Sequence, residues 1–389
     1  MRTIIHNCVN RLVALLAILL LAAPLSAQSN NIIWSGSFET GDILQWHHHE
    51  RHDLPWIWGI PEYCRPEGYP DVFGGDGSCL SLDSNRVRHG EYSAKFTIKN
   101  ALNGEEPRDC DNGNCDRRRS QLSAFRTLPE VYNVLPYLSE RWISFSVYLP
   151  DNWQPTGGGW GPVLFGIKPL TNGDQLSGIA NVHLEKDSWE IHHRWSPVVN
   201  PSSSDVPWQY QMFYRKDYPV IGGNPRWDDG VADFPNPDVS RQALASVNRG
   251  GWTDWVLHIK FDARGSSQGG SGFMRYYKRE DDGPWIKVVD IAPRRIERGG
   301  LTFDRGIGYN SPPTNNNGGF GIGIGTYMAK SQVWNAPNNL SLNFDNIRIG
   351  NQSASLSEME PNGAPGSAGG SDGTESRPTP PSEIRVTQQ

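Results

Sequence analysis

Residues 318–328 are GGFGIGIGTYM, and the alternation in this stretch is the starting point for the fold. In a strand, successive side chains point to opposite faces of the sheet. One face is apolar and consists of Phe320, Ile322, Ile324 and Thr326. The other face consists of Gly321, Gly323, Gly325 and Tyr327. Glycine inside a strand often marks a close approach of a ligand or another chain. The stretch predicts either a groove floor for a long substrate, with Tyr327 reaching into it, or a strand whose glycines relieve crowding against a second sheet.

The same alternation recurs along the chain and predicts further strands. The clearest of them are at residues 90–99, 117–126, 141–149, 252–262 and 342–350. Gly (42) and Pro (29) are plentiful, and amphipathic helical patterns are almost absent after residue 27. Short strands joined by long loops, without alternating helices, predict an all-β fold. We expect a β-sandwich jelly roll with long loops, whose concave face is a natural groove for a polymer.

The N-terminal segment has the pattern of a secretory signal peptide. A basic start with Arg2 and Arg11 precedes an apolar run at residues 12–21, and small residues follow up to Ala27. This pattern predicts cleavage near residue 27 and a secreted or periplasmic protein. We expect three parts: a signal peptide at 1–27, a jelly-roll domain at 28–350, and a disordered Ser/Gly/Pro-rich tail at 351–389.

The charge balance bears on the partners. Without the two arginines of the signal, 34 basic residues stand against 42 acidic ones, a net charge of −8. An acidic protein is not built for nucleic acid, since phosphate contacts need basic side chains. A local basic strip can still bind an anionic polymer. No later segment is apolar enough to span a membrane, so we expect no membrane partner.

The cysteines predict crosslinks in the N-terminal third. Cys64, Cys79, Cys110 and Cys115 remain after Cys8 leaves with the signal. An even set in an exported protein indicates two disulfides. Proximity in sequence favours Cys64–Cys79 and Cys110–Cys115, although three pairings are possible.

Two loops are rich in potential metal ligands. Residues 47–53 are HHHERHD, and residues 103–116 hold several carboxylates and amides. The second loop could hold Ca²⁺, but it lacks the spacing of a helical calcium loop, and a solvated, disulfide-closed turn is the alternative. The histidines of the first loop fit solvated side chains as well as ligands. We expect no metal site and no required cofactor, with Ca²⁺ as the one candidate ion.

The ordered series of motifs resembles a known family. It comprises SFETGD at 37–42, GEYSAKF at 90–96, RSQL at 119–122, WISFSVYLP at 142–150, WTDWVLHIKFD at 252–262 and FDNIRIG at 344–350. Over residues 34–350 this series is similar to the jelly-roll polysaccharide lyases of the heparin lyase I type, a group that resembles alginate and glucuronan lyases. The resemblance implies β-elimination on a uronic-acid polysaccharide by a secreted enzyme.

This reaction sets chemical requirements on the site. The C5 proton of a uronate becomes removable when its carboxylate is neutralised by Arg, an amide or a cation. A base must take this proton, and an acid must protonate the leaving glycosidic oxygen. In these families a His and a Tyr share the two roles, or the Tyr performs both. The resemblance implies that Arg119 neutralises the carboxylate, that Gln121 supports it, and that Tyr327 is an acid or base.

The sequence departs from the family where a Q-x-H pattern is expected. Residues 163–168 are VLFGIK, so Lys168 could act as base if its pKa is lowered, or Asn181 and His183 on the next strand could supply the amide and the imidazole. The alternative is a surface lysine and a hydrogen-bonded sheet histidine. We include Arg117, Asn181, His258 and Lys260 as substrate-binding candidates.

Two further classes of function remain open at this point. A non-catalytic glycan-binding protein on the same scaffold would explain the missing Q-x-H pair, and 15 tryptophans would suit stacking on sugars. A glycoside hydrolase would need two facing carboxylates, for which Glu185 and Glu190 are candidates. In each case we expect a monomer whose partner is an anionic polysaccharide.

Overall fold

The alternating glycine stretch forms β16 (Phe320–Ala329), a strand in the middle of a sheet. The computed structural model describes residues 31–41, 46, 57–58, 80–98, 117–124, 135–153, 162–169, 178–185, 187–195, 210–216, 233–298, 301–308, 319–329 and 340–361. The predicted inner face of β16 is confirmed, because Phe320, Ile322, Ile324 and Thr326 are all buried.

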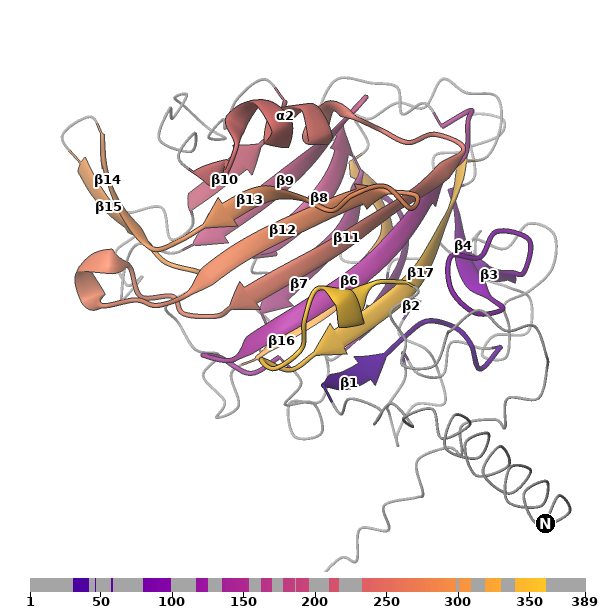
Figure 1. Ribbon diagram of the computed structural model, residues 1–389, viewed down its shortest axis with the longest axis horizontal. Coiled ribbons are helices and arrows are strands. Elements are labelled where there is room, and N and C mark those ends of the chain that lie inside the picture. Colours follow the sequence, from indigo (N-terminus) through magenta and orange to yellow (C-terminus); the bar gives the residue numbers. More distant parts are fainter. Residues whose placement is uncertain are drawn as a thin grey trace, which may run out of the picture. The chain divides into compact units, whose positions relative to one another are not determined.

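Two antiparallel sheets face each other (Figure 1). The eight-stranded sheet has the order β13-β12-β11-β6-β17-β4-β3, and β1 pairs with β17 beside β4. Its strands are β1 (Ile32–Ser35), β3 (Leu80–Asp83), β4 (Ser93–Ile98), β6 (Glu140–Leu149), β11 (Gly251–Lys260), β12 (Phe273–Glu280), β13 (Ile286–Ile291) and β17 (Leu340–Gly350). The second sheet contains seven strands in the order β10-β9-β8-β7-β16-β5-β2.

The seven-stranded sheet carries most of the predicted site residues. Besides β16, its strands are β2 (Ile57–Trp58), β5 (Arg117–Ala124), β7 (Val163–Pro169), β8 (Ala180–Glu185), β9 (Ser188–Trp195) and β10 (Tyr210–Tyr214). A separate hairpin, β14 (Arg294–Arg298) with β15 (Leu301–Arg305), projects from the sandwich (Figure 1). Two short 3-10 turns lie at Ser266–Gln268 and Ser357–Met359. This architecture confirms the all-β jelly-roll prediction.

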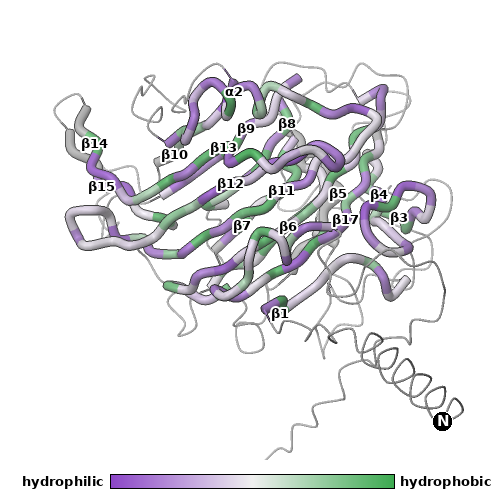
Figure 2. Tube along the Cα trace, in the orientation of Figure 1, coloured by the Kyte–Doolittle hydropathy of each residue, from purple (hydrophilic) through white to green (hydrophobic). Residues whose placement is uncertain are grey.

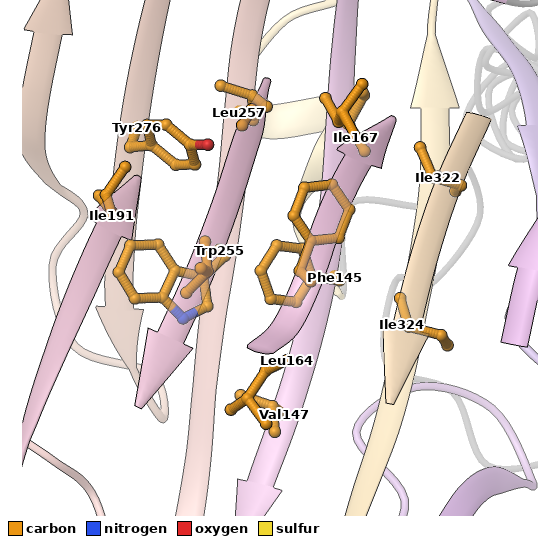
Figure 3. Close-up of a cluster of buried hydrophobic side chains, with 14 of the residues drawn as sticks. Phe145, Val147, Leu164, Ile167, Ile191, Trp255, Leu257, Tyr276, Ile322 and Ile324 are labelled. Carbon is orange, nitrogen blue, oxygen red and sulfur yellow. The ribbon is translucent and has the colours of Figure 1, made fainter. Parts of the chain in front are cut away.

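The core lies between the two sheets. Polar and apolar residues alternate along the strands in Figure 2, and Figure 3 shows the apolar set where the inner faces meet. Phe145 of β6 stacks on Phe165 of β7 with ring centroids 4.4 Å apart. Trp255 and Leu257, which alternation places on the same face of β11, are fully buried. Each such side chain stabilises the fold by about 1.5–3 kcal/mol through burial alone.

A helix lies in a region where none was predicted. α2 (Pro237–Ala245) contacts β13 and β9. Asn236 caps its N-terminus, where the side chain accepts a hydrogen bond from the Val239 amide, and Pro237 begins its first turn. An Asn cap followed by Pro is a strong start signal for a helix. The buried Lys278 Nζ donates to the carbonyls of Ala243 and Ser246 at the other end.

The disordered tail was predicted to begin at residue 351, but the structure describes packed residues up to 361. Residues 351–361 form a described segment in which Ala354 and Met359 pack against Trp142 and Val256. The Arg348 guanidinium donates to the carbonyls of residues 358, 360 and 361. The Ser/Gly/Pro content did not reveal this segment, because its contacts to the domain come from a few residues, among them Ala354, Met359 and the partner Arg348.

Several predictions fall on residues that the structure does not describe. These are the signal peptide at 1–27, the tail beyond residue 361, and the four cysteines with their proposed disulfides. Among the described residues, no helix has the length and apolar character needed to cross a membrane.

Candidate active site

The strand register brings three predicted catalytic residues, Arg119, His183 and Tyr327, into one row across the seven-stranded sheet. Tyr327 of β16 pairs with Arg119 of β5 on one side and with Val163 of β7 on the other. Val163 pairs in turn with His183 of β8, and His183 pairs with Glu190 of β9. Residues directly opposite each other on paired strands share a face of the sheet. The row therefore lies on the outer face, away from the core, and we call it the reaction row.

The strand spacing sets the distances within the reaction row. Neighbouring strands lie about 4.8 Å apart, so the backbones of Tyr327 and His183, with β7 between them, are about 10 Å apart. Arg119 is the next position beyond Tyr327 in the same row.

A bulge in β7 lies between Tyr327 and His183. Val163 pairs with His183 while Phe165 pairs with Val182, so β7 has one more residue than β8 here. The extra residue, Leu164, is fully buried, and Figure 3 shows it beside Val147 in the core. Bulges re-aim side chains and are frequent next to active sites. This one allows Val163 to face outward beside His183.

A second row runs across the same strands, four residues from Tyr327 on β16 and two residues from His183 on β8, and two of its three positions are glycines. Gly323 of β16 pairs with Gly166 of β7, which pairs with Asn181 of β8. A Cβ at Gly166 would lie 2.6 Å from the Asn181 amide, and a Cβ at Gly178 would lie 2.3 Å from it. The glycines therefore leave the space that the Asn181 side chain occupies. Hydrogen bonding orients this buried amide, whose oxygen accepts from Arg194 Nη1 at 2.9 Å.

His183 is buried and packs against a second histidine. Its ring stacks on that of His192 with centroids 3.6 Å apart and an interplanar angle of 19°. Phe213 of β10 contacts the His192 ring edge-on at 4.3 Å. Burial lowers the pKa of His192 well below its ordinary value, and the charges of Arg194 and Arg215 lower it further. His192 is therefore neutral at neutral pH.

Two carboxyls and an arginine border the histidine pair. Glu185 and Glu190 are hydrogen-bonded to each other. Arg215 Nη1 lies 3.3 Å from Glu185 Oε2 and 3.6 Å from Glu190 Oε2. Burial, with the neighbouring Glu190, raises the pKa of Glu185 to about 7, and Arg215 opposes this rise. Burial also raises the pKa of Glu190.

Lys168 lies on the same sheet but far from the reaction row. It pairs with Gly321, six residues from Tyr327 along β16. At about 3.4 Å per residue, the two positions are about 20 Å apart. Two residues were considered as the base, Lys168 and His183. The register places His183 in the same row as Tyr327, with Val163 between them, and places Lys168 far from that row. Gln121 pairs with Gly325 and Arg117 with Ala329, on either side of Arg119.

His258 and Lys260 do not join the other candidates. Both belong to β11 of the eight-stranded sheet. His258 stacks on Trp142 with centroids 3.8 Å apart, and its Nε2 lies 2.8 Å from Glu140 Oε1. The sequence pattern correctly turned His258 away from the core. Alternation separates inside from outside but does not say which of two sheets a strand enters, so the prediction grouped residues from opposite faces of the sandwich.

The sequence analysis considered Glu190 only as a hydrolase carboxyl, and it missed the other groups around His183, which are His192, Arg194, Phe213 and Arg215. A signal for Glu190 and His192 was present, because Glu185 pairs with Ser188 across a tight hairpin turn. Such a turn fixes the register, and it sets Glu190 opposite His183 and His192 opposite Asn181.

The described residues contain no group of three or more His, Cys, Asp or Glu side chains that could hold a metal ion. The two loops considered for metal binding, at 47–53 and 103–116, lie outside the described ranges.

Comparisons with known proteins identify one family. A family profile described as polysaccharide lyase matches residues 38–348. No curated protein matches the chain.

Solved structures with a similar fold include lyases and a glucanase. An endo-β-1,4-glucuronan lyase from the fungus Trichoderma reesei has 14% identity and a TM-score of 0.46, covering 76% of this chain and 95% of its own. A marine alginate lyase from Aplysia kurodai has 14% identity and a TM-score of 0.36, with 82% and 99% covered. A β-glucanase catalytic domain from Podospora anserina has 14% identity and a TM-score of 0.36, with 84% and 98% covered.

Proposed function

Since the chain belongs to the polysaccharide lyase family, we propose that it cleaves a uronic-acid-containing polysaccharide by β-elimination on the outer face of the seven-stranded sheet. The observation that carries this proposal is the reaction row, in which Arg119, Tyr327 and His183 occupy one line across four adjacent strands. A neutraliser, an acid and a base at these positions meet the needs of the reaction.

The proposed chemistry assigns one task to each residue. Arg119 pairs with the carboxylate of the uronate and stabilises the enolate-like charge that develops when C5 loses its proton. His183 accepts the C5 proton as a neutral imidazole. The C4–O4 bond breaks, a C4=C5 double bond forms, and the Tyr327 hydroxyl gives its proton to O4. Water is not consumed, and no cofactor is needed for any step.

The remaining candidates support binding. Gln121 and Arg117 share a strand and its alternation with Arg119, so they extend the row of polar positions along β5. The backbone at Gly321 and Gly323 of β16 carries no side chains and would allow neighbouring sugars to approach closely. Lys168, about 20 Å from the reaction row, is suited to an anionic group on a distant sugar rather than to the reaction itself.

A glycoside hydrolase is less well supported by the same geometry. Hydrolysis needs two carboxyl groups about 5 Å apart or more, on either side of the scissile bond. Glu185 and Glu190 hydrogen-bond to each other, which leaves no room for a glycosidic oxygen between them.

Export of the protein is part of the proposal. The polymer is too large to enter a cell, and the N-terminal signal pattern at residues 1–27 would deliver the enzyme to it. The acidic net charge fits an anionic substrate only if the basic positions of β5 gather at the reaction row.

The test is ultraviolet absorbance during incubation with alginate, glucuronan, heparin-type and chondroitin-type chains, pectate and ulvan. An unsaturated uronate absorbs, so a rise with one polymer supports β-elimination and identifies the substrate. Tyr327→Phe should abolish the rise, while the matched control Tyr277→Phe on the other sheet should retain it. New reducing ends without absorbance would indicate hydrolysis, and no change with any polymer would refute the proposal.

A further inference from the structure

Glu190 is the acidic group opposite His183, at the β9 end of the reaction row. It is buried, and three groups surround its carboxylate: the Glu185 carboxyl, the Arg215 guanidinium at 3.6 Å, and the His192 ring. Burial, with the hydrogen bond from the neighbouring carboxyl, raises the pKa of Glu185 to about 7. Burial raises the pKa of Glu190 as well, while that hydrogen bond and the charge of Arg215 oppose the rise.

The contact between Glu190 and His192 fixes a tautomer. His192 Nε2 and Glu190 Oε1 form a hydrogen bond between two residues on the same face of β9. Because His192 is neutral, its single proton must lie on Nε2 if Glu190 is ionised. A carboxylate that accepts from one ring nitrogen holds an imidazole in one tautomer and one orientation.

The orientation of His192 is transmitted to His183 by ring stacking. The His183 and His192 rings are stacked, with centroids 3.6 Å apart. The Phe213 ring contacts His192 edge-on, with centroids 4.3 Å apart. The charged groups near this pair are Glu185 of β8, Arg194 of β9 and Arg215, which directly follows β10. His192 is the residue whose ring stacks on that of His183.

We propose that Glu190 is a positioning residue, which orients His192 and through it holds the His183 ring at the angle needed to take a proton from a sugar in the reaction row. This inference rests on the proposed function, because it assigns the base to His183. It adds a residue that touches neither substrate nor reacting atoms.

The first variant is Glu190→Gln, which preserves shape but removes the negative charge. We expect kcat to fall about 10–100-fold, the size of effect seen when a group that orients an active-site histidine is lost. KM should change less than about 2-fold, because binding and ground-state contacts remain. Glu190→Asp, which restores a carboxylate, should recover part of the lost kcat.

The chain provides a matched control. Glu140 and His258 form the same kind of pair on the other sheet, with Oε1 and Nε2 2.8 Å apart. Glu140→Gln makes the same chemical change away from the reaction row, and kcat should remain at the wild-type value. Equal losses in the two variants would overturn the proposal, as would a loss that Glu190→Asp does not lessen.

A second readout does not depend on turnover. Nitrogen NMR of the imidazoles in the full chain distinguishes the two neutral tautomers, and a His192→Asn variant assigns the signal. In the wild type His192 should be the Nε2–H tautomer from pH 6 to 8, and in Glu190→Gln it should become a mixture. An unchanged signal overturns the proposal. If the wild type cleaves no polymer, the proposed function fails, and this measurement alone decides whether Glu190 orients His192.

Discussion

Each sheet carries a glutamate–histidine pair on its outer face, and the two pairs differ in what stacks on the imidazole. On the eight-stranded sheet His258 bonds to Glu140 and stacks on Trp142. On the seven-stranded sheet His192 bonds to Glu190 and stacks on a second imidazole, His183. An indole offers no titratable nitrogen, whereas an imidazole can accept a proton.

The charged groups near the two glutamate–histidine pairs also differ. On the eight-stranded sheet, Arg275 pairs with Asp290, and Asp254 lies between Arg88 and Arg279. Around the other pair, two carboxyls share one arginine. Fully matched charges stabilise a fold, while a carboxyl with a raised pKa stores a titratable proton near neutral pH. The same residue pair thus serves architecture on one face and, in our proposal, chemistry on the other.

The largest expected difference between the faces comes from replacing the stacked histidines. His183→Gln should lower kcat by about 10²–10⁴-fold, the usual contribution of a general base. His258→Gln should leave kcat within about 2-fold of wild type. Initial rates on the cleaved polymer measure both. Similar losses in the two variants would erase the distinction between the faces.

The reverse difference should appear in stability. Asp254 is buried, accepts from Ser146 Oγ at 2.7 Å, and pairs with Arg88 at 2.7 Å and Arg279 at 2.9 Å. Asp254→Ala leaves two partly buried guanidiniums without their carboxylate and should cost about 3–5 kcal/mol. Urea unfolding measures this loss, and the folded fraction should retain its kcat.

The control for Asp254 is an exposed ion pair beside the other sheet. Asp187 lies 3.1 Å from Lys216, and its side chain is 67% exposed. Asp187→Ala should cost less than about 1 kcal/mol, because water screens such a pair. A loss as large as that of Asp254→Ala would contradict the view that burial decides the difference.

A smaller effect is expected from two glycines that each adjoin an asparagine. A Cβ at Gly166 would lie 2.6 Å from the Asn181 amide, and a Cβ at Gly251 would lie 2.3 Å from that of Asn248. Gly166→Ala should displace Asn181 and lower kcat/KM about 10-fold, since a small misplacement near the reacting groups is costly. Gly251→Ala should leave kcat/KM unchanged and lower stability by about 1 kcal/mol. A loss of kcat/KM in both variants would contradict the view that only Gly166 adjoins the reacting groups.

The smallest effect concerns the proton of Glu185. Glu185 has a pKa of about 7 in the folded protein, above the ordinary value of 4.5. The folded state therefore binds more protons than the unfolded state between these values, and this group's contribution to stability falls as the pH rises from 4.5 to 7. The Glu185→Gln side chain stays neutral at every pH. The Tm of this variant minus the Tm of the wild type should therefore increase by about 2 °C between pH 4.5 and pH 7, and stay constant above pH 7. A difference in Tm that does not depend on pH would contradict the raised pKa.

Much of the fold could be predicted because strand alternation is a local property. In the predicted strands at 141–149 and 252–262, period two places Ile143, Phe145, Val147 and Leu149 on one face of β6, and Trp255 and Leu257 on one face of β11, and all are buried. Helix α2 was missed because its short apolar face gave little periodicity, although Asn236 and Pro237 marked its start.

The site could be predicted only in part, because it depends on which strands become neighbours. Arg119, His183 and Tyr327 were singled out individually, but they are 64 and 144 residues apart along the chain and meet only through the register of β5, β16, β7 and β8. The choice between Lys168 and His183 was open for the same reason. His258 was misplaced because nothing local distinguishes an outer face of one sheet from that of the other.

The positions of the last two strands have a consequence for how the chain folds. β16 lies between β7 and β5, and β17 lies between β6 and β4, so each closes the middle of its sheet. Until residues 320–350 join, these four strands each keep an unpaired edge, which is the kind of surface that recruits other chains. Contacts that span so much of the sequence form slowly. A folding intermediate of this protein should therefore be split through both sheets, and its solubility should depend on how soon the C-terminal strands arrive to fill the gaps.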